Sequence, residues 1–354
     1  MYCKSLLVKL ATSANHQLLR NTRLCGNTIC SHFYPTSGLQ AHLQYRLCSN
    51  YYKTNPDVAP GAIHNVKSIC SKWAEHFKHK NIPEPEVSAE LIVAHVLGVK
   101  TLAGVVPWQI VPTVKTDKIN KLCLLRLERM PVQYIIEEWD FRDLLLEMRP
   151  PVLIPRPETE ELIGFIHQYQ VSNHLSPPEW ILDIGCGCGA IILSLCKEYP
   201  LSQCIGIDQS PAACDLSRKN ANSNSLAVHI ENIQFNDDTV KKEKLFHHGF
   251  DLIVSNPPYI KKEDLEILPP EIKCYEDVSG ALDGGADGLE IIVSILRNTK
   301  YLLNKQGLLW LEVDSSHPDK VKNLVENNLD WGLQYIQTYN DLFGKPRFCL
   351  LSLH

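Results

Sequence analysis

Residues 250–259, with the sequence FDLIVSNPPY, decide how the rest of the chain is organised. The apolar run that opens this segment stops at Asn256, which is followed by two prolines and Tyr259. A short apolar run cut off by prolines is typical of a buried parallel strand. Because ligands of open α/β sheets bind beyond the carboxyl ends of the strands, we expect Asn256 and Tyr259 at the mouth of a site.

The loop Asn256-Pro257-Pro258-Tyr259 suits the recognition of a nitrogen attached to a planar group. Such a nitrogen is a poor nucleophile because its lone pair is delocalised. The Asn256 side-chain oxygen and the Pro257 carbonyl can each accept one N–H, which aims the nitrogen at an electrophile and stabilises its growing positive charge. Pro258 stiffens the loop, and the Tyr259 ring can cover the planar group. An ordinary strand-ending turn is the alternative.

A second diagnostic segment, residues 180–189, reads WILDIGCGCG and is followed by a helical pattern. A strand, a glycine loop and a helix in succession are typical of the first βα turn of a nucleotide-binding sheet. Asp183 ends the strand, and the next strand ends in Asp208, at the distance from the loop where an acid takes ribose hydroxyls. The glycines expected to approach the ligand are Gly185, Gly187 and Gly189.

The glycine spacing distinguishes between cofactors. A dinucleotide-binding enzyme needs Gly-x-Gly-x-x-Gly, whereas this loop reads Asp-x-Gly-x-Gly-x-Gly and is similar to the S-adenosylmethionine loop of Rossmann-like methyltransferases. That resemblance implies S-adenosylmethionine as cofactor, with Asp183 available to its ammonium group. Asp237 follows a strand-like segment and is expected at the adenine amino group, although Asp238 is an equally placed alternative. Together with the Asn-Pro-Pro-Tyr loop, these features predict an amino-group methyltransferase that needs no dedicated general base.

The remaining patterns complete a fold prediction. A glycine turn at residues 282–289 precedes a predicted helix at 290–298, and further strands are expected at 308–313 and 347–351. The predicted fold class is therefore α/β. Residues 158–354 are expected to form a Rossmann-like, seven-stranded methyltransferase domain whose sheet ends in an antiparallel hairpin.

Residues 60–130 have helical periodicity and are expected to form a small helical domain that docks a partner. Residues 131–157 are predicted to be a β-hairpin linker, with short strands at 134–136, 139–141 and 144–148. The Pro-Arg-Pro turn that contains Arg156 and Pro157 feeds the next helix start. Spacing alone leaves two explanations of this turn, a lid or substrate wall and a simple domain boundary.

The first 50 residues carry Lys4, Lys9, Arg20, Arg23 and Arg46, and no acidic residue. With their frequent Ser and Thr, they predict a mitochondrial presequence and a matrix location. A basic tail that binds an acidic partner is the alternative. Without these residues, Lys plus Arg falls from 35 to 30 against 40 Asp plus Glu, a net charge near −10.

This charge argues against direct binding of nucleic acid, which requires a basic surface. No apolar run approaches the length of a membrane span, so no membrane association is expected. The 13 cysteines form no C-x-x-C pair, which argues against a metal site. We expect a monomer.

The chain resembles the HemK/PrmC family from about residue 85 to 350. The segments that carry the resemblance are 89–98, 131–135, 153–160, 183–189, 256–259 and 282–289. The resemblance implies methylation of the glutamine amide in the Gly-Gly-Gln motif of a peptide-chain release factor, with Arg156, Pro157 and the Asn-Pro-Pro-Tyr loop on the substrate side. The presequence-like start makes the mitochondrial member the most similar, so the implied partner is a mitochondrial release factor.

Two departures concern the substrate side. The bacterial pattern has Tyr-Ile-x-Gly where residues 134–137 of this chain read YIIE, with Glu137 in place of the glycine. It has Glu-x-Gly-x-x-Gln where residues 312–317 of this chain read EVDSSH.

Three other functions stay open at this point. The loop chemistry also suits an adenine-N6 methyltransferase acting on DNA or RNA, or a protein lysine methyltransferase, and the fold can serve as a non-catalytic scaffold. Cofactor binding separates the scaffold from the enzymes.

Overall fold

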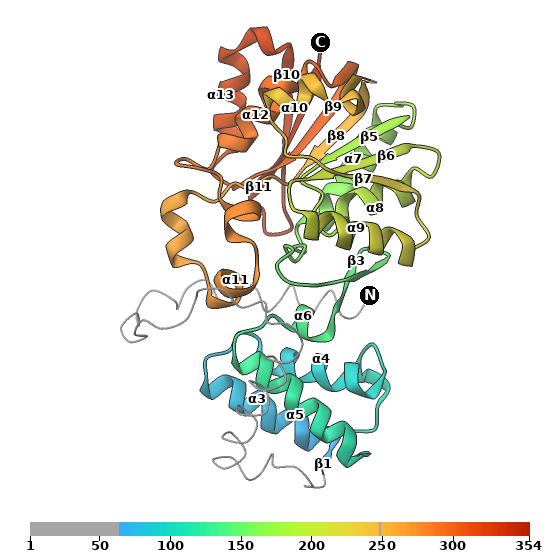
Figure 1. The fold of residues 1–354 in the computed structure, drawn as a ribbon, viewed down its shortest axis with the longest axis vertical. Coiled ribbons are helices and arrows are strands. Elements are labelled where there is room, and N and C mark those ends of the chain that lie inside the picture. Colours follow the sequence, from blue (N-terminus) through green and yellow to red (C-terminus); the bar gives the residue numbers. More distant parts are fainter. Residues whose placement is uncertain (1–63, 248) are drawn as a thin grey trace. The chain divides into compact units, whose positions relative to one another are not determined.

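A computed structural model of the protein describes residues 64–247 and 249–354. The predicted presequence, residues 1–50, lies outside the described residues. The chain divides into two compact units, with the boundary between Ile136 and Glu137. Figure 1 shows the helices of the first unit in blue to green and the sheet of the second in green to red.

The first unit is helical, as predicted. Its elements are β1 (His64–Asn65), α3 (Val66–His79), α4 (Pro85–Leu97), η3 (Leu102–Gly104), β2 (Ile110–Val111), α5 (Thr113–Leu127) and α6 (Val132–Ile136). Helix α3 begins at a capping box, in which the Asn65 side chain accepts the Ser68 N–H and the Ser68 hydroxyl accepts the Asn65 N–H. Its predicted apolar face, Val66, Ile69, Trp73 and Phe77, is buried.

The strand predicted at residues 134–136 is wrong, because this segment forms helix α6. The carbonyl of Pro131 accepts the N–H groups of Tyr134 and Ile135, which starts a helical turn. A run of three apolar residues has no periodicity that separates strand from helix. The two other strands of the predicted linker form a hairpin, β3 (Glu138–Phe141) and β4 (Leu144–Glu147), which belongs to the second unit.

The second unit contains a seven-stranded sheet with the order β10-β11-β9-β8-β5-β6-β7. Its strands are β5 (Trp180–Ile184), β6 (Gln203–Asp208), β7 (Val228–Asn232), β8 (Phe250–Ser255), β9 (Leu303–Glu312), β10 (Leu333–Asn340) and β11 (Pro346–Leu353). Five neighbouring strands, from β9 to β7, are parallel, and β10 and β11 form an antiparallel hairpin at one edge. The predicted fold class is confirmed.

Helices cover both faces of this sheet (Figure 1). The long helices of the unit are α7 (Thr159–Ser172), α8 (Ala190–Glu198), α9 (Pro211–Ser223), α12 (Glu290–Thr299) and α13 (Pro318–Asn327). The short ones are α10 (Asp237–Lys242), η4 (Lys244–His247), η5 (Lys262–Ile267), α11 (Pro270–Tyr275), η6 (Val278–Leu282) and η7 (Leu329–Trp331). Residues of α10, α12 and α13, among them Val240, Ile292 and Val321, share a buried core with one face of the strands. Contacts of α7, α8 and α9 with strands lie on the opposite face.

The point where the strand order reverses lies at β5, which has β6 on one side and β8 on the other. Both pairings are parallel, and Ser255 at the end of β8 is in register with Ile184 of β5 and with Leu311 of β9. The carboxyl ends of these strands therefore meet at one edge of the sheet, where open α/β sheets bind ligands. Among the residues that the structure describes, no helix is long and apolar enough to cross a membrane.

Burial predicts a large difference between two identical substitutions. Leu309 of β9 is fully buried in the core, whereas Leu201 is 94% exposed. We expect Leu309→Ala to lower the free energy of unfolding by about 2–5 kcal/mol, because it removes transfer free energy and leaves a cavity. Leu201→Ala should change it by less than about 0.5 kcal/mol. Urea unfolding followed by circular dichroism measures both, and equal effects would contradict the assigned core.

Candidate active site

A cavity opens at the carboxyl ends of β5, β6 and β8, and is called here the strand-end cavity. The predicted site residues that line it are Gly185, Gly187, Asp208, Asn256, Pro257 and Pro258. Segments that are far apart in the sequence therefore meet there, among them the glycine loop, the end of β6, the Asn-Pro-Pro-Tyr loop and residues 151–153. The sequence-predicted grouping of the glycine loop with the Asn-Pro-Pro-Tyr loop is present in the structure.

The glycines of the loop after β5 have different structural roles. Gly185 has φ 78°, and a Cβ placed on it would meet nothing within 4 Å. Its conformation, rather than lack of space, therefore favours glycine. A Cβ on Gly189 would lie 2.6 Å from the Ser217 hydroxyl of α9, so this glycine permits close packing of the loop on a helix. Gly189 does not line the strand-end cavity.

Asp208 ends β6 and lines the strand-end cavity, as expected for a residue that binds ribose hydroxyls. One carboxylate oxygen accepts the Gly187 N–H at 2.9 Å, and the other accepts the Ser210 N–H at 2.8 Å. Burial raises the pKa of Asp208, and these two N–H groups act in the opposite direction. Because each carboxylate oxygen has a second lone pair, Asp208 can hold the loop and still accept bonds from a ligand.

Asp183 is fully buried at the end of β5, next to the glycine loop, and does not itself line the cavity. Neither of its carboxylate oxygens has a hydrogen-bond partner. Burial, followed by the nearby charge of Asp208, raises the pKa of Asp183 to about 8. A buried acid without a donor is unfavourable unless a cation or a donor reaches it. A ligand group that carries positive charge or an N–H donor would therefore stabilise the ionised form of Asp183.

The charge of the lining distinguishes between ligand classes. Among the residues that the structure describes, the strand-end cavity is lined by two carboxylates, Asp208 and Asp277, and by no Lys or Arg. A phosphate-bearing dinucleotide would be repelled by these groups, whereas a cationic sulfonium with an ammonium group would be attracted. Together with the unpartnered Asp183, this lining fits S-adenosylmethionine.

The structure places Asp237 away from this cavity. Strand β7 ends at Asn232, and Asn236 starts helix α10 through a capping box with Thr239. The Asp237 carboxylate accepts bonds from Arg297 and Asn298, each at 2.7 Å. Neither Asp237 nor the alternative, Asp238, is among the lining residues.

Residues that the sequence reasoning missed occupy this side instead. Ile233, Gln234 and Phe235 follow β7 and line the strand-end cavity. The sequence from Ile230 to Phe235 is strand-like, but β7 ends at Asn232. Their position directly after a parallel strand is the sequence signal that could have identified them as site residues. Ile233 and Phe235 give this part of the cavity an apolar surface.

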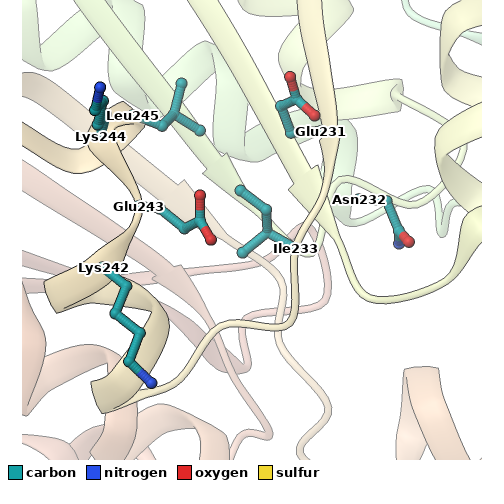
Figure 2. A pocket seen from close by; sticks show the side chains of 7 residues that line it. All are labelled: Glu231, Asn232, Ile233, Lys242, Glu243, Lys244 and Leu245. Atoms are coloured by element: carbon teal, nitrogen blue, oxygen red, sulfur yellow. The ribbon is translucent and has the colours of Figure 1, made fainter.

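A second, polar hollow lies beside this region. Figure 2 shows its lining, which comes from the end of β7 and from the chain at the end of α10: Glu231, Asn232, Ile233, Lys242, Glu243, Lys244 and Leu245. Ile233 lines both this hollow and the strand-end cavity. The residues predicted to bind cofactor or substrate do not line the hollow, so the strand-end cavity is the candidate active site.

The Asn-Pro-Pro-Tyr loop is held at its first residues by hydrogen bonds. The Ser255 hydroxyl donates to the Ile184 carbonyl of β5 at 2.6 Å. The side-chain nitrogen of Asn256 donates to the Thr159 hydroxyl, at the start of α7, over 3.5 Å. Because the nitrogen end of the Asn256 amide is engaged there, its oxygen end remains available as an acceptor.

Tyr259, at the end of the loop, is supported by the glycine turn at residues 282–289. A Cβ on Gly284 would lie 2.8 Å from the Tyr259 Cα, and a Cβ on Gly288 would lie 2.4 Å from its carbonyl oxygen. The Ile260 N–H donates to the Leu282 carbonyl at 3.0 Å, which completes the support. Tyr259 is partly buried, packs against the main core and does not line the cavity.

Arg156 and Pro157, which were expected on the substrate side, do not line the strand-end cavity. One guanidinium nitrogen of Arg156 donates to both carboxylate oxygens of buried Glu276, at 2.9 and 2.7 Å. Burial raises the pKa of Glu276, and Arg156 opposes this effect. The Asp277 N–H donates to the Pro151 carbonyl at 2.8 Å, and both of these residues line the cavity. The Pro-Arg-Pro turn is thus linked to the cavity only through Glu276 and its neighbour Asp277, and the choice between a substrate wall and a domain boundary stays a prediction.

No cluster of three or more His, Cys, Asp or Glu side chains with metal-binding geometry occurs in residues 64–247 and 249–354.

The buried acid Asp183 predicts a pH-dependent stability. Its pKa of about 8 in the native state exceeds the value in an unfolded chain, so the native state loses stability as the pH rises across that interval. Asparagine stays neutral. We therefore compare the free energy of unfolding of Asp183→Asn with that of wild type at two pH values. The variant's advantage over wild type should be larger at pH 8 than at pH 5, by at least about 1 kcal/mol.

Urea unfolding at both pH values tests this prediction, with Asp143→Asn at an exposed position as the matched control. A difference between Asp183→Asn and wild type that is the same at pH 5 and pH 8 would contradict the assigned burial of this carboxylate.

Comparisons with known proteins match both units. Residues 69–136 match the PrmC N-terminal domain family, and residues 171–268 match the Methyltransferase small domain family. The MTRF1L release factor glutamine methyltransferase of Homo sapiens is 42% identical over 304 residues, which cover 83% of this chain and 89% of that protein. A release factor glutamine methyltransferase of Fusobacterium nucleatum is 36% identical over 73% of this chain and 72% of that protein.

A solved structure of a release factor-specific protein-(glutamine-N5) methyltransferase from Alicyclobacillus acidocaldarius aligns with 59% of this chain and 99% of its own, at 20% identity and a TM-score of 0.34. The family assignment is based on the sequence relatives, because they are similar over most of their length. On that basis the chain belongs to the family of release factor glutamine methyltransferases.

Proposed function

We propose that this protein transfers a methyl group from S-adenosylmethionine to the side-chain amide nitrogen of the glutamine in the Gly-Gly-Gln motif of a mitochondrial release factor. The observation that carries the proposal is the pair of acceptors, the Asn256 side-chain oxygen and the Pro257 carbonyl, at the edge of a cavity that is lined by carboxylates and lacks lysine and arginine among the described residues. The names of the relatives support the same substrate.

The residues of the strand-end cavity fit the cofactor. S-adenosylmethionine supplies an electrophilic methyl group on a sulfonium. The backbone at Gly185 and Gly187 would lie against its methionine part, Asp183 would neutralise its ammonium, and Asp208 would accept its ribose hydroxyls. The apolar surface at Ile233 and Phe235 is suited to an adenine ring, and takes the place first predicted for Asp237.

The Asn-Pro-Pro-Tyr loop would act on the glutamine. Two acceptors, at Asn256 and Pro257, bind the two N–H bonds of the amide and orient the nitrogen lone pair. They also stabilise positive charge on the nitrogen as it forms its new bond. The proton then leaves readily, so no side chain has to act as a strong base. Pro258 stiffens the loop and lines the cavity, and Tyr259 anchors its end.

Two alternatives are less well supported. An adenine-N6 methyltransferase needs a basic surface for the nucleic acid, whereas residues 51–354 carry a net charge near −10. A lysine methyltransferase must remove a proton from an ammonium before transfer, and two neutral acceptors aimed at a planar amide are poorly suited to that task.

We also infer the cellular setting of the reaction. The basic, acid-free residues 1–50 support import into the mitochondrial matrix. The domain predicted over residues 60–130, whose residues from His64 onward are helical for the most part, is proposed to dock the release factor. The enzyme is proposed to act as a monomer and without direct contact to nucleic acid. Size-exclusion chromatography of the mature chain, alone and with the release factor, tests whether the enzyme is a monomer.

Mass spectrometry with fragmentation tests the reaction directly. The mature protein is incubated with S-adenosylmethionine and a mitochondrial release factor, and we expect the mass of one CH₂ group to be added at the Gly-Gly-Gln glutamine. Asn256→Ala should lower the rate at least about 100-fold, because one acceptor for the reacting amide is lost. Methyl transfer only into DNA, RNA or a lysine would overturn the proposed substrate and keep the methyltransferase.

The glycine turn yields a second prediction. Gly284→Ala should lower the rate of methyl transfer at least about 10-fold, because the new Cβ pushes on the Tyr259 backbone and moves the loop. Gly164→Ala in α7 is the matched control, because its Cβ would meet only Arg142 at 3.9 Å. Initial rates with the release factor measure both variants, and equal rates would show that the glycine turn does not support the loop.

A further inference from the structure

Glu312 is a buried acid that the mechanism above does not use. It ends β9 and is 1% exposed. Because Ser255, the last residue of β8, is in register with Leu311 of β9, Asn256 directly after β8 lies beside Glu312, the last residue of β9. Glu312 does not line the strand-end cavity, so it lies behind the loop and not in contact with the ligand space.

Three side chains form a closed group behind the loop. The Thr159 hydroxyl and the Asn256 amide nitrogen both donate toward the Glu312 carboxylate. The same amide nitrogen donates to the Thr159 hydroxyl at 3.5 Å. The second carboxylate oxygen of Glu312 has no hydrogen-bond partner. Every contact to Asn256 in this group is thus made to the nitrogen end of its amide.

The contacts with Glu312 and Thr159 set the orientation of the Asn256 amide. An asparagine side chain has a donor end and an acceptor end of nearly the same shape, so packing alone does not distinguish its two orientations. An ionised carboxylate accepts hydrogen bonds and cannot donate them. It therefore attracts the nitrogen end and repels the oxygen end, which turns the oxygen toward the cavity.

We propose that Glu312 is a positioning residue for methyl transfer, which holds the Asn256 amide so that its oxygen faces the substrate nitrogen. The inference rests on the proposed function, because only a substrate with N–H bonds needs that orientation. It assigns a role to a residue of the segment 312–317, where the sequence departs from the bacterial pattern after its glutamate.

The proposal has a consequence for pH. Burial is the largest influence on Glu312 and raises its pKa to about 7. Thr159, Arg347 and Asn256 lower this pKa, and the charge of Glu158 raises it further. Tyr259 also faces this carboxylate. The protonated acid carries an O–H donor, which can bind the oxygen end of the amide and cancel the preference. Activity should therefore fall as the pH drops through about 7.

Glu312→Gln tests the role at nearly constant volume. We expect kcat to fall at least about 10-fold, because the glutamine amide supports both orientations of Asn256. The KM for release factor and the affinity for S-adenosylmethionine should change by less than about 2-fold, since Glu312 touches neither. The rise of kcat through pH 7 should disappear. Glu326→Gln on the exposed face of α13 is the matched control.

A second variant keeps the proposal testable if Glu312→Gln fails to fold. Thr159→Val removes the bridging hydroxyl and preserves the shape of the side chain. Because this hydroxyl lowers the pKa of Glu312, the pH midpoint of kcat should move to higher pH. Thr159→Ser, which restores the hydroxyl, should return the midpoint to that of wild type.

The outcomes separate this inference from the proposed function. An active wild type with an unchanged kcat and pH profile in Glu312→Gln, or an unchanged midpoint in Thr159→Val, would overturn the role of Glu312 alone. A wild type that binds S-adenosylmethionine and does not methylate a release factor would overturn the proposed function, and the inference with it.

Discussion

The site depends on the parallel register of β8 between β5 and β9. That register brings Ser255, Ile184 and Leu311 level with one another, so the three strands end together. The chain must then leave the sheet, and two prolines prevent it from continuing the ladder. The strand pairing therefore places Asn256 and Pro257 at the edge of the cavity.

Buried carboxylates give this edge its chemical character. Asp183, one residue before the end of β5, and Glu312, the last residue of β9, belong to the two strands that flank β8. Burial raises the pKa of both, to about 8 and about 7. Asp183 lies beside the glycine loop, where a cationic cofactor would neutralise it. Glu312 lies behind Asn256, where hydrogen bonds from within the protein engage it. The proposed roles of these two acids, cofactor binding for Asp183 and orientation of Asn256 for Glu312, thus differ because their surroundings differ.

Sequence reasoning identified the strand ends, because apolar runs that stop at Asp183, Asp208 and Asn256 carry a strong local signal. It failed where short-range hydrogen bonds, rather than the apolar pattern, decide the local structure. Residues 134–136 became a helix through bonds to Pro131, and Asp237 entered a helix through the Asn236 cap. Pairings across long separations, such as Arg156 with Glu276, have no local signature at all.

A crystal structure of the protein with S-adenosylhomocysteine and a release factor tests the central claim most directly. The account predicts that the amide nitrogen of the Gly-Gly-Gln glutamine lies within about 2.7–3.2 Å of both the Asn256 side-chain oxygen and the Pro257 carbonyl. A glutamine bound elsewhere in the cavity, or an Asn256 amide whose nitrogen faces the substrate, would contradict it.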